Sequence, residues 1–286
     1  MDVIKAPMNY IGNKYRIISD IQKFFPRNID TFVDIFCGGC DVTINTEAKR
    51  KFANDINYHV VEIYQHFQKM ISDDIDIIAE IDKLIEKWEL SKTNEEGYKA
   101  FREHYNQTKN PLELYTLMCF SFNYQFRFNN DHEYNNPFGK NRSSFTPVMR
   151  SNLIEFIKRI ESVSFSSIDF LDFDYSVLQT ANDFIYADPP YLLTCGSYND
   201  GKRGFKGWNE DEEIKLLTLL AELDARGIKF ALSNVAEHKG QKHKILLDWK
   251  KEHGFHIHNI NFNYNNCNYQ ARNRENLTRE VLITNY

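Results

Sequence analysis

Short apolar runs of strand length alternate with segments of helical periodicity along this chain. Buried strands are expected at residues 31–36, 51–55, 162–168, 183–187 and 228–233. Apolar residues at helical spacing fill most of the intervals between these runs. Because strands that alternate with helices pair into a sheet, the pattern predicts an α/β fold with helices on both faces.

One long interval departs from this alternation. Residues 57–161 are mostly helical in pattern, which predicts a helical domain inserted into a sheet domain made of 1–56 and 162–286. Residues 123–138 interrupt the helical pattern and carry turn-forming asparagines, so a hairpin or ordered loop is expected there. Further elements are expected as helices at 14–25, 57–90, 95–122, 212–225 and 242–253, and as an antiparallel strand pair at 255–264 and 279–284.

Composition limits the class of protein without naming a partner. The net charge is −5 and the sequence pI is near 6.0. These values neither indicate nor exclude nucleic-acid binding, because such binding depends on local patches of charged residues on the surface. No apolar stretch approaches the roughly 20 residues of a membrane span, and no signal peptide is evident, so a soluble intracellular protein is expected. Cys37 and Cys40 form a lone pair without a second pair at zinc-ligand spacing, and no metal site is predicted.

A glycine turn follows the first predicted strand. Cys37, Gly38 and Gly39 come directly after the run that includes Asp34, and Asp55 ends the next strand. In open α/β sheets such a turn binds nucleotide-like ligands, and an acid after the second strand accepts hydrogen bonds from ribose hydroxyls. The alternative is structural: a tight turn, with Asp55 capping a helix.

A second motif, Asp188-Pro189-Pro190-Tyr191, follows the buried strand at 183–187. The prolines fix the backbone and remove two N–H donors, which leaves carbonyl oxygens available. The Asp188 carboxylate and the Pro189 carbonyl can then accept both hydrogens of an exocyclic amine, while Tyr191 offers a ring for stacking. The motif therefore predicts a site for an amino group on a flat heterocycle. A purely structural turn is the alternative.

These two motifs resemble those of the Dam-type (D12 class, alpha-group) DNA adenine-N6 methyltransferases, and most closely the bacteriophage Dam proteins. The segment from Tyr10 to Lys14 resembles the extra cofactor motif of that family, and the motif order also matches. Further collinear matches lie at 90–93, 137–140, 188–193, 211–213 and 226–235. The resemblance implies a Rossmann-like methyltransferase sheet with an inserted, mostly helical DNA-recognition domain. It also implies S-adenosylmethionine as cofactor and double-stranded DNA as partner.

The resemblance assigns residues to the cofactor and to the reaction. Asp55 would bind the ribose, Asp169 or Phe170 would flank the cofactor adenine, and Asp188 would lie between the cofactor and the target amine. Cytosine-N4 enzymes of this superfamily usually carry Ser at the position of Asp188, which favours adenine. The cofactor set is Tyr10, Gly12, Lys14, Asp34, Phe36, Cys37, Gly38, Gly39, Asp55, Asp169, Phe170 and Asp188, and the catalytic set is Asp188, Pro189, Pro190 and Tyr191.

The insertion would read the DNA sequence. Arg127 is the expected bidentate guanine contact, with a plain surface arginine as the alternative. Phe122 or Gln125 would wedge beside the extruded base. The full DNA-binding set is Phe122, Asn123, Gln125, Arg127, Pro137, Lys140 and Arg142, with Arg150 as a further phosphate contact. The family suggests the site GATC, although the stretch Tyr124-Gln125-Phe126 is bulkier than usual.

Two other functions remain open at this level. An RNA adenine methylase would share the chemistry, but the expected Arg127 hairpin and the Lys14 segment disfavour it. A silent DNA-binding relative would lack transfer activity, but the intact Asp188 motif and Asp55 disfavour that. Residues 201–207 resemble a small insertion that adds phosphate contacts or forms a loop tip. The expected compartment is the cytoplasm of a bacterium or a phage-infected host, with no obligate protein partner.

Overall fold

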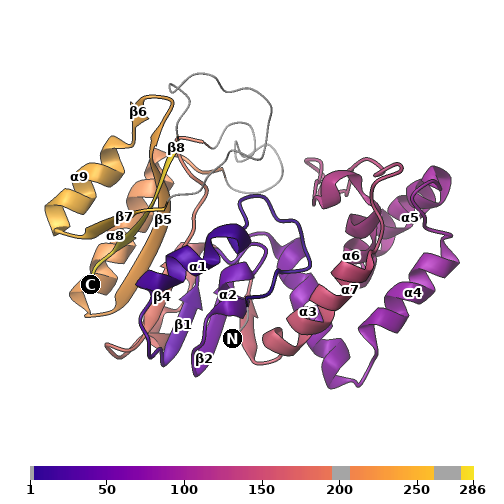
Figure 1. The fold of residues 1–286 in the computed structure, drawn as a ribbon, viewed down its shortest axis with the longest axis horizontal. Coiled ribbons are helices and arrows are strands. Elements are labelled where there is room, and N and C mark those ends of the chain that lie inside the picture. Colours follow the sequence, from indigo (N-terminus) through magenta and orange to yellow (C-terminus); the bar gives the residue numbers. More distant parts are fainter. Residues whose placement is uncertain (1–2, 195–206, 261–277) are drawn as a thin grey trace. The chain divides into compact units, whose positions relative to one another are not determined.

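The computed structural model describes residues 3–194, 207–260 and 278–286. The chain separates into two compact units, each built from segments that are distant in sequence (Figure 1). The first unit comprises Met1–Tyr15, Cys37–Asn45 and Asn54–Ile168. The second comprises Arg16–Phe36, Thr46–Ala53 and Asp169–Tyr286. The helical segment predicted as an insertion thus shares its unit with the N-terminal residues and the glycine turn.

A mostly parallel sheet organises the second unit. Its strands include β1 (Thr31–Asp34), β2 (Arg50–Asn54), β4 (Phe184–Ala187), β5 (Lys229–His238), β6 (Gln241–Lys242), β7 (His256–Asn259) and β8 (Thr278–Thr284). They run in the order β2-β1-β4-β5-β8-β7, with β6 paired to β5. The first four are parallel, and β8 pairs antiparallel with both β5 and β7. The predicted α/β sheet and the antiparallel strand pair are confirmed, while residues 261–264 of the latter lie outside the described residues.

Both faces of this sheet are covered, and β1 and β4 are buried at every position because their successive side chains alternate between the two faces. On one face Val33 and Ile185 join a buried cluster with Leu216 and Leu220 of a helix. On the other face the Phe25 ring packs 4.8 Å from the Phe184 ring, centroid to centroid. The helical elements of this unit are α1 (Ile18–Ile21), α8 (Glu210–Ala225), α9 (Lys244–His253) and the short 3-10 turns η2 (Gln22–Phe24), η4 (Phe170–Asp172) and η5 (Tyr175–Val177).

The prediction of one continuous helix at 14–25 is wrong. Three short elements, η1 (Tyr15–Ile17), α1 and η2, follow one another in its place. Ile17 departs from helical dihedrals at φ −116° and ψ 4°, and Phe25 is extended at ψ 150°. Phe25 precedes Pro26, and a residue before proline is driven out of the helical region.

The first unit is mainly helical. It contains α2 (Asp41–Asn45), α3 (Tyr58–Ser72), α4 (Ile77–Lys87), α5 (Glu95–Thr108), α6 (Pro111–Phe120), α7 (Pro147–Ile160), the 3-10 turn η3 (Phe122–Tyr124) and the strand β3 (Val163–Ser166). Every residue of α6 after Pro111 is buried, and α3, α4 and α5 all contact it. In the described residues no helix is both long and apolar enough to span a membrane.

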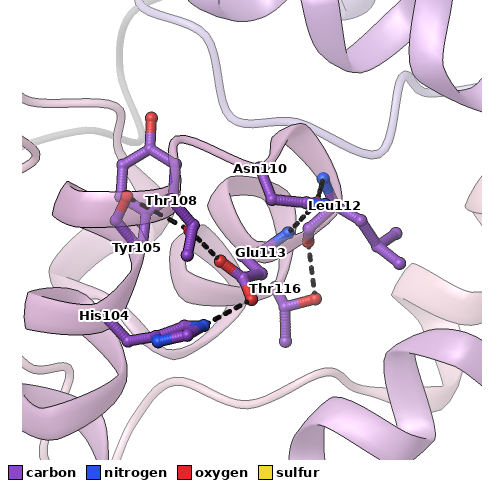
Figure 2. Close-up of polar contacts among 7 residues, drawn as sticks. All are labelled: His104, Tyr105, Thr108, Asn110, Leu112, Glu113 and Thr116. Carbon is purple, nitrogen blue, oxygen red and sulfur yellow. Dashed lines mark hydrogen bonds and ion pairs between the residues drawn. The ribbon is translucent and has the colours of Figure 1, made fainter.

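The segments 57–90 and 95–122, predicted to be helical, contain two helices each: α3 and α4 in the first, α5 and α6 in the second. Figure 2 shows the reason for the break between α5 and α6. The Asn110 side chain accepts hydrogen bonds from the backbone N–H groups of Leu112 at 2.9 Å and Glu113 at 3.3 Å, and a proline follows it. Glu113 in turn accepts from the Thr108 hydroxyl at 2.5 Å and lies 3.1 Å from His104 Nε2. An asparagine cap followed by proline starts a new helix rather than continuing the old one.

Candidate active site

The glycine turn of the first unit is folded tightly beneath an aromatic ring. Cys37 N–H donates to the Asn54 carbonyl at 2.8 Å, and Cys40 N–H donates to the Cys37 carbonyl at 2.6 Å. Gly38 has φ +45°, and a Cβ at this position would lie 2.9 Å from two ring carbons of Tyr10. The close approach of the ring and the left-handed backbone both require glycine here. Tyr10 and the turn, two predicted cofactor segments, are therefore brought together.

The Asp55 carboxylate holds this turn by accepting hydrogen bonds from backbone N–H groups. Its carboxylate oxygens accept from the backbone N–H of Gly38 at 2.9 Å and of Asn57 at 2.8 Å. Burial raises the pKa of Asp55 to about 6, against the lowering effect of these two donors. The Tyr64 hydroxyl also donates to the Gly38 carbonyl at 2.6 Å. Tyr64 is a supporting residue that the sequence did not reveal, because a tyrosine on an apolar helix face looks like core.

The N-terminal segment is tied to the start of α2. The buried Lys14 donates through Nζ to the Gly12 carbonyl at 3.1 Å. The carboxylate of Asp41, the first residue of α2, accepts from the Ala6 N–H at 2.9 Å. Burial raises the pKa of Asp41 to about 6, and Lys14 is among the charges that lower it. This arrangement holds Lys14 and Gly12 in the same unit as the glycine turn.

The second unit gathers three aromatic rings. The Phe36 ring lies 5.4 Å from Phe170 and 5.6 Å from Trp208, and Phe170 lies 5.8 Å from Trp208. Asp169 caps the turn η4 by accepting from a backbone N–H at 3.0 Å. The Trp208 indole N–H donates to the buried Glu213 at 2.8 Å. Phe36 and Phe170, each predicted to contact the cofactor, therefore lie side by side, and Trp208 is an addition that no sequence motif marked.

The Asp188 motif lies where β4 ends. Asp34 occupies the corresponding end of β1, in the same unit. Asp188 and Pro190 are half-buried and Pro189 is buried. The Tyr191 hydroxyl donates to Asp188 Oδ1 at 2.9 Å, so this tyrosine contacts its own motif as well as offering a ring.

A second carboxylate faces the same hydroxyl. Glu280 Oε1 of β8 lies 3.0 Å from the Tyr191 oxygen. Burial raises the pKa of Tyr191 well above its ordinary value, and the charges of Asp188 and Glu280 add to this shift. Sequence reasoning missed Glu280, because a single acid near the start of a terminal strand carries no recognisable spacing.

The segment between α6 and α7 is an ordered loop rather than a long hairpin. It contains only isolated bridges, between Phe128 and Tyr134 and between Ser121 and Phe138. The buried Asn136 amide takes the place of a ladder by donating to the carbonyls of Phe122 at 3.0 Å and Gln125 at 2.9 Å. Of the two forms that the sequence left open, the ordered loop is the one observed.

Several predicted DNA contacts lie on this loop. An open pocket of about 380 Å³ is lined by Asn9, Asn123, Tyr124, Gln125, Arg142 and Ser143. Asn123 and Tyr124 have φ of 56° and 55°, and the Asn9 amide donates to the Asn123 carbonyl at 2.9 Å. Consecutive left-handed residues other than glycine are uncommon and strained. Three of the predicted contacts, Asn123, Gln125 and Arg142, are therefore gathered at one pocket.

The remaining predicted contacts lie outside that pocket. Arg127, Pro137 and Lys140 are exposed, and Phe122 is 41% exposed with the Arg142 guanidinium 5.6 Å above its ring. Arg150 was expected to contact phosphate. Its guanidinium makes two hydrogen bonds to Asp82, so this arginine already has an acidic partner within the unit. The basic residues at 202, 203 and 206 and the cysteines at 195 and 267 lie outside the described residues.

Cys37, Cys40 and Cys119 are buried thiols. Among the described residues no group of three or more His, Cys, Asp and Glu side chains has metal-binding geometry.

Comparison with known proteins shows the family to which the chain belongs. The family model for D12 class N6 adenine-specific DNA methyltransferases matches residues 10–266. Modification methylase StsI of Streptococcus sanguinis is 49% identical over 285 residues, which are 99% of this chain and 43% of that protein. Type II methyltransferase M.FokI of Planomicrobium okeanokoites is 50% identical over 285 residues, with the same coverage of 99% and 43%.

The chain belongs to the D12 class N6 adenine-specific DNA methyltransferase family. It spans less than half the length of these two relatives. The DNA adenine methylase of Escherichia coli K12 is only 25% identical, over 237 residues that make up 80% of each chain. The D12 class predicted from the motifs is therefore confirmed, whereas the predicted closeness to phage Dam proteins has no support from these relatives.

Proposed function

We propose that this chain transfers the methyl group of S-adenosylmethionine to the N6 amine of adenine in double-stranded DNA. The observation that carries the proposal is the half-buried Asp188 carboxylate at the end of β4, with one oxygen held by Tyr191. Ligands of open α/β sheets bind beyond the carboxyl ends of the strands, which is where this carboxylate lies. Membership of the family and the names of the relatives support the same reaction.

The residues present fit an adenosine-bearing cofactor. The glycine turn leaves no space for a Cβ under Tyr10, which is the close backbone packing expected of a nucleotide-binding turn. The carboxylate of Asp55 is suited to ribose hydroxyls, because each of its oxygens retains a second lone pair beside its backbone donor. The half-buried Phe36 and Trp208 rings, packed against the buried Phe170, offer apolar surface suited to a purine.

The chemistry needs a positioned amine more than it needs a nucleophilic side chain. When bound, S-adenosylmethionine supplies the electrophilic methyl group. The Asp188 carboxylate and the Pro189 carbonyl would accept the two amine hydrogens, which localises the nitrogen lone pair toward that methyl. The Tyr191 hydroxyl donates to Asp188 Oδ1 and so orients the carboxylate. Positioning and electrostatic stabilisation would supply most of the rate.

The target base has to leave the duplex to reach such a site. We assign the ordered loop between α6 and α7 to sequence reading, with Phe122 and Gln125 beside the extruded base and Arg127 at a guanine. Lys140 and Arg142 would contact phosphates, which position the protein without specifying sequence. GATC is the site suggested by the Dam resemblance alone. The relatives that are 49% and 50% identical to this chain are modification methylases with names other than DNA adenine methylase. We therefore include GATC as one of several test sequences.

Product analysis tests the proposed reaction. Purified chain is incubated with S-adenosylmethionine and either unmethylated duplex DNA or RNA, and the nucleosides are then quantified by mass spectrometry. We expect N6-methyladenine in the DNA and none in the RNA. Product only in RNA would assign the chain to RNA methylation. DNA binding without product in either substrate would make it a silent relative and would contradict the proposal.

A further inference from the structure

Glu280 reaches the Asp188 motif through the topology of the sheet. Ala187, the last residue of β4, pairs with Leu232 on β5, and Leu232 pairs with Ile283 on β8. Strand β8 is antiparallel to β5, whereas β4 is parallel to it. Residues that precede Ile283 therefore extend toward the same end of the sheet as residues that follow Ala187, namely the carboxyl end of β4 and β5 (Figure 1). Glu280 is three positions before Ile283, and the Asp188 motif starts one position after Ala187. The two acids therefore approach the same tyrosine from strands far apart in sequence.

Both carboxylates compete for one hydrogen. The Tyr191 oxygen lies 2.9 Å from Asp188 Oδ1 and 3.0 Å from Glu280 Oε1, both within hydrogen-bond distance. A phenol carries a single O–H donor, so at any moment it donates to one of these oxygens. Glu280 is only 8% exposed, and in such surroundings a polar contact is stronger than in water. The share of the hydrogen that Asp188 receives thus depends on Glu280.

We propose that Glu280 is a positioning residue for methyl transfer, which acts through Tyr191 by sharing its hydroxyl hydrogen with Asp188. The inference rests on the proposed function, because the quantity that Glu280 adjusts is the orientation and charge of the carboxylate that would hold the target amine. Glu280 anchors the hydroxyl end of Tyr191 from β8 while Asp188 holds the same end from its own motif. The Tyr191 ring and the Asp188 carboxylate are then held together in one hydrogen-bonded group that also includes Glu280.

A double-mutant cycle tests this role, because it separates an action through Tyr191 from a general effect on the strand. The four proteins are the wild type, Glu280→Gln, Tyr191→Phe and the double variant. Each is mixed in excess with S-adenosylmethionine and DNA, and the single-turnover rate of N6-methyladenine formation is measured. Dissociation constants for DNA and S-adenosylmethionine and the urea midpoint are measured beside it. Both substitutions keep the shape of the side chain, so the fold is expected to survive.

Glu237→Gln is the matched control. Glu237 is on β5, which pairs with β8, and it is half-buried near the same end of the strand pair. The substitution removes the same charge as Glu280→Gln. No contact between Glu237 and Tyr191 is found in the described part of the chain. This variant is expected to keep the wild-type rate within about twofold.

The expected result is a coupled loss of rate. Glu280→Gln and Tyr191→Phe each slow the single turnover by about tenfold, and adding Glu280→Gln to Tyr191→Phe slows it by less than about twofold more. Both dissociation constants stay within about twofold of the wild type. Losses that multiply in the double variant, or a Glu280→Gln rate equal to the wild type, would overturn the role of Glu280 while leaving the proposed function intact. A wild type that forms no N6-methyladenine would overturn both.

Discussion

Single residues carry the chemistry of this chain through their immediate contacts. Asp55 is a structural acid, since it binds two backbone N–H groups, and it is also the proposed ribose acceptor. Burial raises its pKa from 3.8 to about 6, so its charge changes in an accessible pH range. The same raised pKa means that the unfolded chain ionises first as pH rises. This residue therefore favours the folded state below about pH 4, and the favourable contribution is lost as pH rises through about 6.

Cofactor affinity should follow the opposite trend. Because the carboxylate is the better acceptor for ribose hydroxyls, we expect the affinity for S-adenosylmethionine to rise as pH increases through about 6. At about pH 5 roughly a tenth of Asp55 is ionised, so binding should be about tenfold weaker than at about pH 8. Calorimetric titration across this range measures the midpoint.

Two variants assign that midpoint. Asp55→Asn should flatten the pH dependence, whereas Asp41→Asn should retain it, although the pKa of Asp41 is also raised to about 6. A midpoint that persists in Asp55→Asn would exclude Asp55 as its source.

Elements determine where these residues lie, and the loop between α6 and α7 is the most informative of them. Arg127 is exposed on this loop, and its carbonyl accepts from Asn135 N–H at 2.9 Å, which holds the backbone. A bidentate guanine contact contributes about 1–3 kcal/mol of discrimination, so Arg127→Ala should relax site preference by about tenfold or more. Sequencing of methylated sites on a mixed DNA pool measures the preference.

Lys140→Ala is the control for that experiment. A phosphate contact should weaken binding uniformly across sequences and reduce the slope of affinity against salt by about one. A methylation pattern unaltered by Arg127→Ala would rule out a base-reading role for this arginine.

The start of α6 offers a test of stability at the same scale. Asn110 accepts from two backbone N–H groups at the helix N-terminus (Figure 2). Asn110→Ala should lower the free energy of unfolding by about 1 kcal/mol, the usual effect of removing such a cap. The urea midpoint should fall at an unchanged slope, while Asn110→Ser should recover most of the loss. An Asn110→Ala midpoint equal to that of the wild type would show that the cap is not stabilising.

At the scale of the whole molecule, the periodicity of the sequence predicted most of the sheet and the helices. Strands at 31–36, 183–187 and 228–233 were recognisable because burial on both faces makes them largely apolar. Helix breaks were harder, since apolar spacing continued across the Asn110 cap and hid it. The tight glycine turn and the Asp188 motif were visible because they are local in sequence.

Contacts between distant segments could not be predicted. Glu280 approaches Tyr191 only because β8 inserts antiparallel beside β5, and Trp208 meets Phe36 only in the folded unit. A pairing of this kind has no local sequence signal.

The most direct test of the central claim compares product formation with binding in Asp188→Ala. We expect this variant to bind duplex DNA and S-adenosylmethionine within about threefold of the wild type, because the proposed role of Asp188 is mainly on the reacting amine. We expect N6-methyladenine formation to fall by at least about a thousandfold, since the proposed acceptor for the amine hydrogens is gone. Wild-type amounts of N6-methyladenine made by Asp188→Ala would contradict the assignment of the reaction to this site.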